Sequence, residues 1–238
     1  MSRDSGSNRP SFDAYAADYD HALEQGISVS GEDRDYFASG RVQWLARRLR
    51  ECGETPRRIL DFGCGTGTGS KFLGEQYGEA SVLGVDISDP SLETGRRLHG
   101  SDRIQFRLTA AYQPAAEMDL VFCNGVFHHI PVAERARALE LIHRSLRPRG
   151  LFALWENNPW NPGTRYVMSR IPFDRDAITL TPPEARHLLG AGGFQVLGTD
   201  FLFIFPHVLA WLRPLESGLA RWPFGAQYLV LGRKALAV

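Results

Sequence analysis

The stretch ILDFGCGTGTGS, residues 59–70, constrains the fold of this chain most strongly. An apolar run typical of a buried strand leads directly into a loop with glycine at positions 63, 65, 67 and 69. Glycine adopts positive φ angles easily and lets the backbone come close to a bound molecule. A strand that enters such a loop and then a helix is the first half of a βαβ unit, so the stretch predicts a ligand site in an α/β fold.

The rest of the chain continues this alternation of short apolar runs and amphipathic helical patterns. Strands are predicted at 57–62, 81–87, 103–108, 118–124, 150–156, 194–204 and 227–234. Helices are predicted at 33–51, 66–77, 89–99, 132–147 and 182–191. Strands that alternate with helices indicate parallel strands whose two faces are both covered, which is the doubly wound architecture.

The 238 residues, 43% of them apolar, suffice for one domain with a single large core. We expect residues 1–10 to be a disordered tail and residues 11–238 to form the domain, with an N-terminal helical lid at 11–52. Residues 157–181 are rich in proline and lack periodicity, so an irregular excursion beside the acceptor site is expected. Residues 205–224 form an apolar segment between the last two strands.

Two features of the loop indicate which ligand it holds. A dinucleotide motif would need a third glycine where Thr68 stands, and no Gly-Lys-Ser/Thr ending marks a phosphate-binding P-loop. Asp86 ends the next predicted strand, where a carboxylate can accept the hydroxyl protons of an adenosine ribose. Together they predict an adenosine-type cofactor without a bridging phosphate.

Four motifs, ILDFGCGTG, VLGVDIS, MDLVFCNGVFHHI and LRPRGLFALWE, cover residues 57–156 in order. The chain resembles the class I S-adenosylmethionine-dependent methyltransferases, close to the small-molecule group that includes the ubiquinone and menaquinone biosynthesis enzymes. The resemblance implies a Rossmann-like, doubly wound α/β fold with seven strands in the order 3-2-1-4-5-7-6, the seventh antiparallel. It also implies S-adenosyl-L-methionine as the cofactor and in-line methyl transfer to oxygen, nitrogen or carbon of a small molecule.

The resemblance also implies roles for single residues. Asp61, Gly63 and Gly65 would approach the amino-acid part of the cofactor. The other implied cofactor-binding residues are Tyr15 and Tyr19 in the lid, Asp86 at the ribose, Ile87 at the adenine, and Asn124 and His129 after the fourth strand. The family often has an acidic residue after the third strand that binds the adenine amine, but here Thr109, Ala110 and Ala111 stand there. The adenine contact is therefore not assigned.

Methyl transfer from a sulfonium mainly requires that donor and acceptor be held in line, and a general base only where the acceptor loses a proton. His128 is the candidate base, and Glu156, which ends a strand at the same rim, is the second catalytic candidate. Asn157, Trp160 and Arg165 are candidate acceptor contacts, although the same run would also suit a rigid turn with solvated side chains. No further Cys, Asp or His completes a ligand set with the His pair, so no metal is predicted.

Composition excludes some partners. Lys plus Arg equals Asp plus Glu at 27 each, and a neutral chain does not favour nucleic-acid binding. Three scattered cysteines, a polar N-terminus and no 18-residue apolar run predict a cytoplasmic protein with no membrane span. The segment 205–224 suits core packing or a homodimer interface, and otherwise an apolar acceptor, which favours a natural-product, lipid-like or sugar-linked substrate. The alternative is an enzyme of the same fold that catalyses a non-methylating step such as cyclisation.

Overall fold

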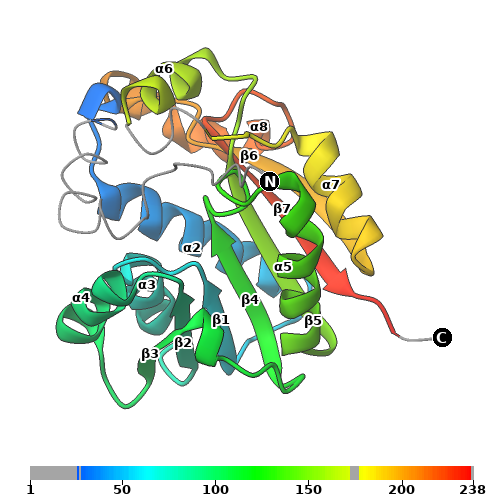
Figure 1. Cartoon of the computed structure of the whole chain (residues 1–238). Helices are drawn as coiled ribbons and strands as arrows, with labels where there is room; N and C mark the ends of the chain where they lie inside the picture. The colour runs from blue at the N-terminus through cyan, green and yellow to red at the C-terminus, as the bar shows by residue number, and fades with distance from the viewer. Residues whose placement is uncertain (1–25, 27, 172–176, 237–238) are drawn as a thin grey trace, which may run out of the picture.

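A computed structural model describes residues 26, 28–171 and 177–236. Its centre is a seven-stranded sheet in the order β3-β2-β1-β4-β5-β7-β6 (Figure 1). Strands β1 to β5 pair in parallel, and β7 pairs antiparallel with both β5 and β6. The predicted fold class, strand order and direction of the seventh strand are confirmed.

The strands lie within a few residues of the predicted positions. They are β1 (Arg58–Phe62), β2 (Ser81–Asp86), β3 (Ile104–Leu108), β4 (Met118–Asn124), β5 (Leu146–Asn157), β6 (Phe194–Leu202) and β7 (Gln227–Lys234). The helices are α2 (Arg34–Glu51), α3 (Thr68–Gln76), α4 (Asp89–His99), α5 (Val132–Ser145), α6 (Pro162–Arg170), α7 (Pro182–Ala191) and α8 (Glu216–Leu219). The short 3-10 helices are η2 (Ser28–Ser30), η3 (Thr109–Ala111) and η4 (His207–Leu215).

Two apolar layers hold the helices on opposite faces of the sheet. One layer packs α5 and α7 on the strands through residues such as Leu139, Ile142 and Leu189. The other packs α2 and α3 through Leu45, Leu73 and their neighbours. Figure 1 shows α5 and α7 in front of the strands and α2 behind them. The central strands are therefore buried on both faces, as their nearly continuous apolar sequences predict.

The strand order reverses between β1 and β4, because β1 leads outward to β2 and β3 whereas β4 leads to β5. Ligands of open α/β sheets bind beyond the carboxyl ends of the strands at this reversal. The glycine loop follows β1 and the His pair follows β4, so both lie at this point. The fold thus brings together two motifs that are more than fifty residues apart in the sequence.

The segment 157–181, predicted to be irregular, contains helix α6. The Asn161 side chain accepts a hydrogen bond from the Thr164 amide at 3.0 Å, and Pro162 occupies the first turn. Asn followed by Pro is a strong helix-start signal, but the nine-residue helix buries only Thr164 and Met168, so it has no apolar periodicity to detect.

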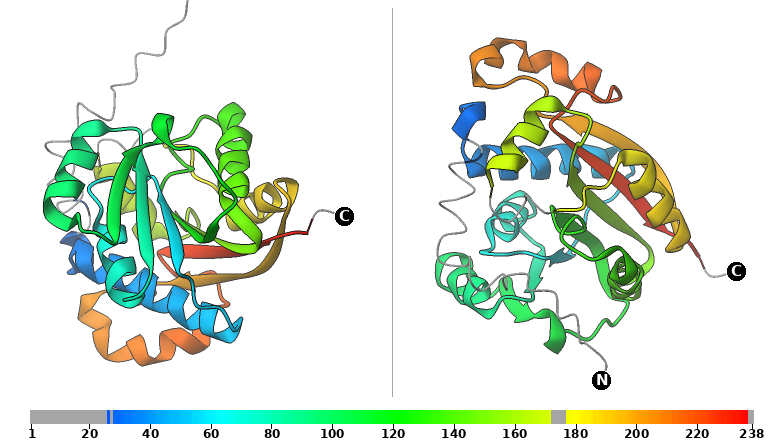
Figure 2. Two further views of the ribbon diagram at one scale, coloured as in Figure 1. Left: turned by 90° about the horizontal axis from the view of Figure 1, so that it is seen from below. Right: turned by 45° about the horizontal axis from the view of Figure 1, so that its top comes forward.

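The apolar segment 205–224 also differs from the expectation of core packing. It forms η4 and α8, and no residue of either is buried; the Trp211 side chain is 75% exposed. Figure 2 shows this segment and α6 at the same end of the molecule. Among the described residues, no helix has the length and hydropathy needed to span a membrane. The predicted tail at 1–10 and the part of the lid before Gly26 lie outside the described residues.

Candidate active site

A cavity of about 470 Å³ opens at the carboxyl ends of β1, β4 and β5. Its wall includes the glycine loop after β1, the residues that follow β4 and β5, and one side of α2. The described wall also includes parts of helix α6, the residues where β7 begins, and residues close to the start of α2 and the end of β6. Its size is in the range of small-molecule sites.

The backbone of the glycine loop explains its sequence. Gly63, Gly65 and Gly67 all have positive φ, at 72°, 53° and 85°. A Cβ on Gly63 would lie 2.3 Å from a Val126 methyl, and one on Gly67 would lie 2.6 Å from the Phe106 ring. A Cβ on Gly65 would meet no atom within 4 Å, and Gly65 lines the cavity. Two glycines are thus needed for packing, whereas Gly65 keeps the cavity open.

Asp86 fastens this loop to the second strand. Its carboxylate accepts hydrogen bonds from the Gly65 amide at 2.8 Å and from the Ser88 amide at 2.9 Å. Each carboxylate oxygen retains a second lone pair. Asp86 and the neighbouring Ile87, whose side chain is 70% exposed, lie outside the cavity wall described above.

Asp61, the last polar residue of β1, is buried in that wall. The Ser70 hydroxyl donates to its carboxylate at 2.7 Å. Burial raises the pKa of Asp61 to about 7, and the charge of Asp86 acts in the same direction. Asp61 is therefore a buried carboxyl close to its titration point, which a cationic group in the cavity would ionise.

His128 and Glu156 form a buried pair at the ends of β4 and β5. Their exposed fractions are 3% and 2%, and His128 Nδ1 lies 2.5 Å from Glu156 Oε2. The other carboxylate oxygen, Oε1, accepts the Phe127 amide at 2.9 Å. Since a carboxylate only accepts, Nδ1 carries a proton and donates it to Glu156. His128 lines the cavity, and Glu156 lies behind it.

A chain of side-chain hydrogen bonds runs along the cavity wall from α2 to β5. Arg41 Nη1 donates to Gln227 Oε1 at 2.8 Å, and Gln227 Nε2 donates to Asn157 Oδ1 at 3.2 Å. Gln227 and Asn157 are directly opposite each other in the antiparallel β5–β7 pair. Nearer the glycine loop, the Arg34 guanidinium donates to the hydroxyls of Thr66 and Thr68 at 3.2 and 3.0 Å.

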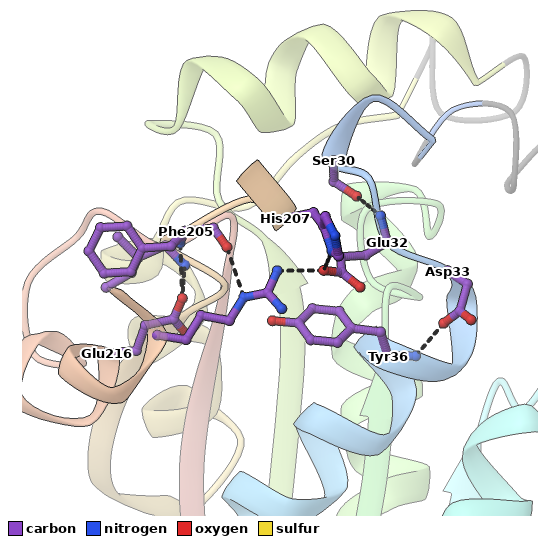
Figure 3. A network of polar contacts seen from close by, with 9 residues as sticks. Ser30, Glu32, Asp33, Tyr36, Phe205, His207 and Glu216 are labelled. Carbon is purple, nitrogen blue, oxygen red and sulfur yellow. Dashed lines mark hydrogen bonds and ion pairs between the residues drawn. The ribbon is translucent and has the colours of Figure 1, made fainter. Parts of the chain in front are cut away.

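A cluster around Glu32 ties the start of α2 to η4. The Glu32 carboxylate accepts from Arg213 at 2.5 Å and from His207 at 2.9 Å (Figure 3). The Arg213 guanidinium also lies 4.5 Å from the centre of the Tyr36 ring. Phe203, with a φ of 61°, packs its ring 5.0 Å from that of Phe37, and both rings line the cavity. These contacts hold η4 and Phe203 against the rim of the cavity.

Comparison with known proteins agrees with this geometry. Residues 59–150 match a family model described as a methyltransferase domain. A trans-aconitate 2-methyltransferase from Methylobacterium nodulans is 30% identical over 146 residues, which are 61% of this chain and 53% of that protein. The chain carries, at residues 59–150, a domain of the class I S-adenosylmethionine-dependent methyltransferase type. It spans about half the length of the first curated relatives it matches.

Solved structures of other proteins show the same fold. The magnesium protoporphyrin IX methyltransferase from Synechocystis PCC 6803, solved with bound SAH, superposes with a TM-score of 0.64 at 19% identity over 94% of this chain and 96% of that one. An S-adenosylmethionine-dependent methyltransferase from Mesorhizobium loti gives 0.58 at 21% identity over 81% and 98%. S-adenosylmethionine is the cofactor of this family.

Half of the fourteen residues that the sequence singled out line the cavity. Those in its wall are Asp61, Gly63, Gly65, Asn124, His128, His129 and Asn157. Glu156 and Asp86 lie just behind this wall, each holding a residue that is part of it. Trp160, Arg165 and Ile87 do not line the cavity. Tyr15 and Tyr19 lie outside the described residues.

Sequence reasoning missed several wall residues. Arg34 and Arg41 lie on α2, which the sequence presented only as an amphipathic helix packed on the core. Gln227 opens the final strand, Phe203 lies near the end of a predicted strand, and Thr164 and Met168 come from the segment predicted to be irregular. Only the helix-start signal at Asn161 could have indicated that α6 contributes to the wall.

Proposed function

We propose that this protein transfers a methyl group from S-adenosylmethionine to a small molecule whose nucleophilic atom loses a proton to His128. The observation that carries the proposal is that the open glycine loop and His128, which is held from behind by the buried Glu156, border one cavity. When bound, the cofactor supplies an activated methyl group on a sulfonium. Proximity and orientation in the cavity then account for roughly 7–11 kcal/mol of the barrier.

The residues at the loop fit this cofactor. The position of Gly65 leaves its side of the cavity open, and the buried Asp61 carboxyl suits the positively charged amino group of a methionine moiety. Asp86 retains lone pairs for the ribose hydroxyls while it holds the loop in place. Asn124 and His129, in the same wall, are the remaining candidates for contact with the methionine moiety.

The His128–Glu156 pair supports an acceptor that carries a proton on oxygen, nitrogen or carbon. A neutral imidazole with Nδ1–H held by a buried carboxylate presents Nε2 as a base, and the carboxylate stabilises the imidazolium that forms. Glu156 acts through His128 and is a positioning residue. A small acceptor is supported by the cavity volume and by the matched relative named for trans-aconitate.

The first experiment tests whether the protein binds the proposed cofactor or a different nucleotide. Calorimetry with the full chain should show saturable binding of S-adenosylhomocysteine and no binding of NAD or ATP at the same concentrations. Binding of NAD or ATP instead would contradict the proposal. With acceptor extracts, formation of S-adenosylhomocysteine indicates methyl transfer, whereas product formation without it would favour the alternative of a cyclisation-type reaction in the same fold.

The second experiment tests the base. His128→Asn should lower kcat by about 10²–10⁴-fold and remove a titration from the pH–rate profile, with the S-adenosylhomocysteine Kd unchanged. Glu156→Gln should also lower kcat and remove that titration, because it changes which nitrogen of His128 carries the proton. The Phe127 amide would retain the Gln oxygen, so the Gln amide nitrogen would face His128 Nδ1 and force the proton onto Nε2. Glu156→Asp is the matched variant that should recover part of the rate. Unaltered profiles in His128→Asn and Glu156→Gln would contradict the assignment.

A further inference from the structure

The part of the cavity wall that comes from α2, α6 and the residues after β6 carries a set of large apolar side chains. We call them the apolar wall: Phe37 on α2, Met168 and Ile171 at the end of α6, and Phe203 and Pro206 after β6. Met168, Ile171 and Phe203 are only 7%, 2% and 9% exposed, although they border the cavity. A ligand that covers them exchanges water for hydrocarbon contacts, which is favourable in proportion to the apolar area buried.

The polar side chains of α6 and its start are already bonded to the protein. The Asn161 oxygen accepts from the Thr164 amide, and the Asn161 nitrogen donates to a main-chain carbonyl just before β7 at 2.7 Å. The Thr164 hydroxyl donates to a second carbonyl of that stretch, also at 2.7 Å. The Tyr166 hydroxyl accepts from Arg170 at 2.6 Å. A polar ligand would have to compete with these bonds, whereas an apolar one leaves them in place.

The charged side chains of α2 in the same wall are also engaged by the protein. Arg34 donates to the hydroxyls of Thr66 and Thr68. Arg41 donates to the Gln227 oxygen, and the Gln227 nitrogen donates onward to the end of β5. These guanidinium groups therefore do not by themselves require a charge on the acceptor, and the apolar side chains next to them determine what fits.

Phe203 reaches the wall through two locally unfavourable choices of residue. Its φ of 61° lies in the left-handed region, which is strained for a residue with a bulky side chain. Helix α2 makes room for its ring with Gly40, where a Cβ would lie 2.8 Å from that ring, and glycine is unfavourable inside a helix. The ring then packs edge-on against Phe37. Strain that the surrounding structure maintains in this way is typical of ligand-binding positions.

We propose that the apolar wall binds the hydrocarbon body of the acceptor molecule, with the nucleophilic atom of the acceptor directed toward His128. This inference rests on the proposed function and adds the class of acceptor: a small molecule with an aromatic ring or hydrocarbon chain and one nucleophile that carries a proton. Burial of the hydrocarbon supplies the affinity, and His128 acts on the nucleophile. Met168 suits such a body because a flexible thioether adapts to rings and chains.

Met168 is the position at which polarity can be changed with little change of shape. Met168→Gln keeps the side-chain length and the helix propensity but places an amide in the apolar wall. Met168→Leu, which keeps the wall apolar, is the matched control. Gly40→Ala is an independent variant, because its methyl group would displace the Phe203 ring while alanine favours the helix.

The test uses the full chain saturated with S-adenosylhomocysteine, with para-cresol, para-ethylphenol and para-propylphenol as apolar probes and trans-aconitate, a small tricarboxylate, as the polar probe. Ligand-observed NMR titration should show affinity that rises about two- to fourfold with each methylene of the phenols. Trans-aconitate should bind at least about tenfold more weakly than para-propylphenol, because its carboxylates would lose water against the wall.

The variants should change this series in different ways. Met168→Gln should weaken para-propylphenol binding at least about fivefold, Met168→Leu should change it by less than about twofold, and Gly40→Ala should reduce the gain per methylene. All three variants should retain the S-adenosylhomocysteine Kd within about twofold, because none of them alters the glycine loop.

Three results would overturn the inference. One is tighter binding of trans-aconitate than of para-propylphenol by the unaltered chain. Another is equal affinity for all three phenols, or a series that Met168→Gln leaves unchanged. The third is a loss of S-adenosylhomocysteine affinity in Met168→Gln and Gly40→Ala, which would assign the apolar wall to the cofactor. Failure of the unaltered chain to bind S-adenosylhomocysteine is a separate result, because it contradicts the proposed function itself.

Discussion

The two halves of the cavity wall are built in different ways. The glycine loop half depends on backbone: Gly63 and Cys64 donate their amides to the Val85 carbonyl, and Gly65 donates to Asp86. The opposite half depends on side chains from distant segments, such as Arg41 with Gln227 and Glu32 with Arg213. The first half is encoded within some thirty consecutive residues, and the second exists only after α2 and the residue before its first turn have met η4 and β7.

This difference indicates how substitutions in such a protein can change the acceptor that it binds while the cofactor stays the same. A loop that is fixed by main-chain hydrogen bonds and glycine conformation tolerates few substitutions, because the ligand meets the backbone itself. A wall of side chains on α2, α6 and β7 can be altered one residue at a time without changing the sheet. We therefore expect the two halves to respond to substitution in separable ways: the loop in ligand affinity, and the distant contacts in stability and acceptor selectivity.

The largest effect is expected at Gly65. Its φ is 53° and a Cβ there would enter open cavity space, so Gly65→Val should reduce S-adenosylhomocysteine affinity by at least about a hundredfold, or roughly 2.7 kcal/mol. Isothermal calorimetry measures the loss. The matched control is Gly53→Val, since Gly53 also has positive φ, at 70°, and open space around its Cβ, but follows α2 away from the cavity.

Both variants carry similar backbone strain, about 1–2 kcal/mol for a side chain in the left-handed region. Their thermal stabilities should therefore fall by comparable amounts, whereas only Gly65→Val should lose binding. Equal affinities in the two variants would mean that the loop does not lie against the cofactor.

The second largest effect is expected at Arg213, whose contacts join segments that lie far apart in the sequence. Arg213→Met removes the ion pair with Glu32, a hydrogen bond to the Phe205 carbonyl and the contact with the Tyr36 ring. We expect a loss of about 1–2 kcal/mol in unfolding free energy, because Glu32 is largely buried and would keep only His207 as partner. Thermal unfolding should show a Tm lower by roughly 2–8 °C, with cofactor affinity unchanged.

Arg186→Met is the control for this substitution. Arg186 is exposed on α7 and donates one hydrogen bond to the Thr199 hydroxyl, so its loss should change the Tm by less than about 2 °C. If Arg213→Met instead weakened cofactor binding as strongly as Gly65→Val, the two halves of the wall would not be separable.

The sequence predicted the sheet and also placed the glycine loop beside Asp86, because these features follow one another locally. Strand, glycine loop, helix and terminal Asp86 follow one another within a single βαβ unit, so spacing alone defines their geometry. The same holds for His128, which follows β4 directly. The link between His128 and Glu156 could not be seen, because it depends on β4 and β5 pairing so that Asn124 lies opposite Trp155.

The other half could not be predicted for a different physical reason. Arg41 is one of many arginines on a helix whose other side packs on the core, and nothing in its neighbours marks it as a wall residue. The apolar run from Phe205 to Phe224 suggested core packing, but Pro206 and Pro214 interrupt it and the segment lies on the surface. Its docking depends on Glu32, which lies more than 170 residues earlier in the chain.

The smallest effect, a fraction of a proton, sharpens the assignment of the loop half. The pKa of Asp61 is raised by burial to about 7, so near pH 7 about half of the molecules carry a neutral Asp61. A ligand whose ammonium group lies near Asp61 favours the ionised form and lowers that pKa, so binding must release protons. We expect the release of up to about half a proton per S-adenosylhomocysteine at pH 7, falling toward zero at pH 9, where Asp61 is already ionised. Calorimetry in buffers of different ionisation enthalpy measures this release.

Adenosine, which lacks the ammonium, should release none, and Asp61→Asn should abolish the release with S-adenosylhomocysteine. Equal release with adenosine, or an undiminished release in Asp61→Asn, would remove Asp61 from the amino-acid end of the cofactor.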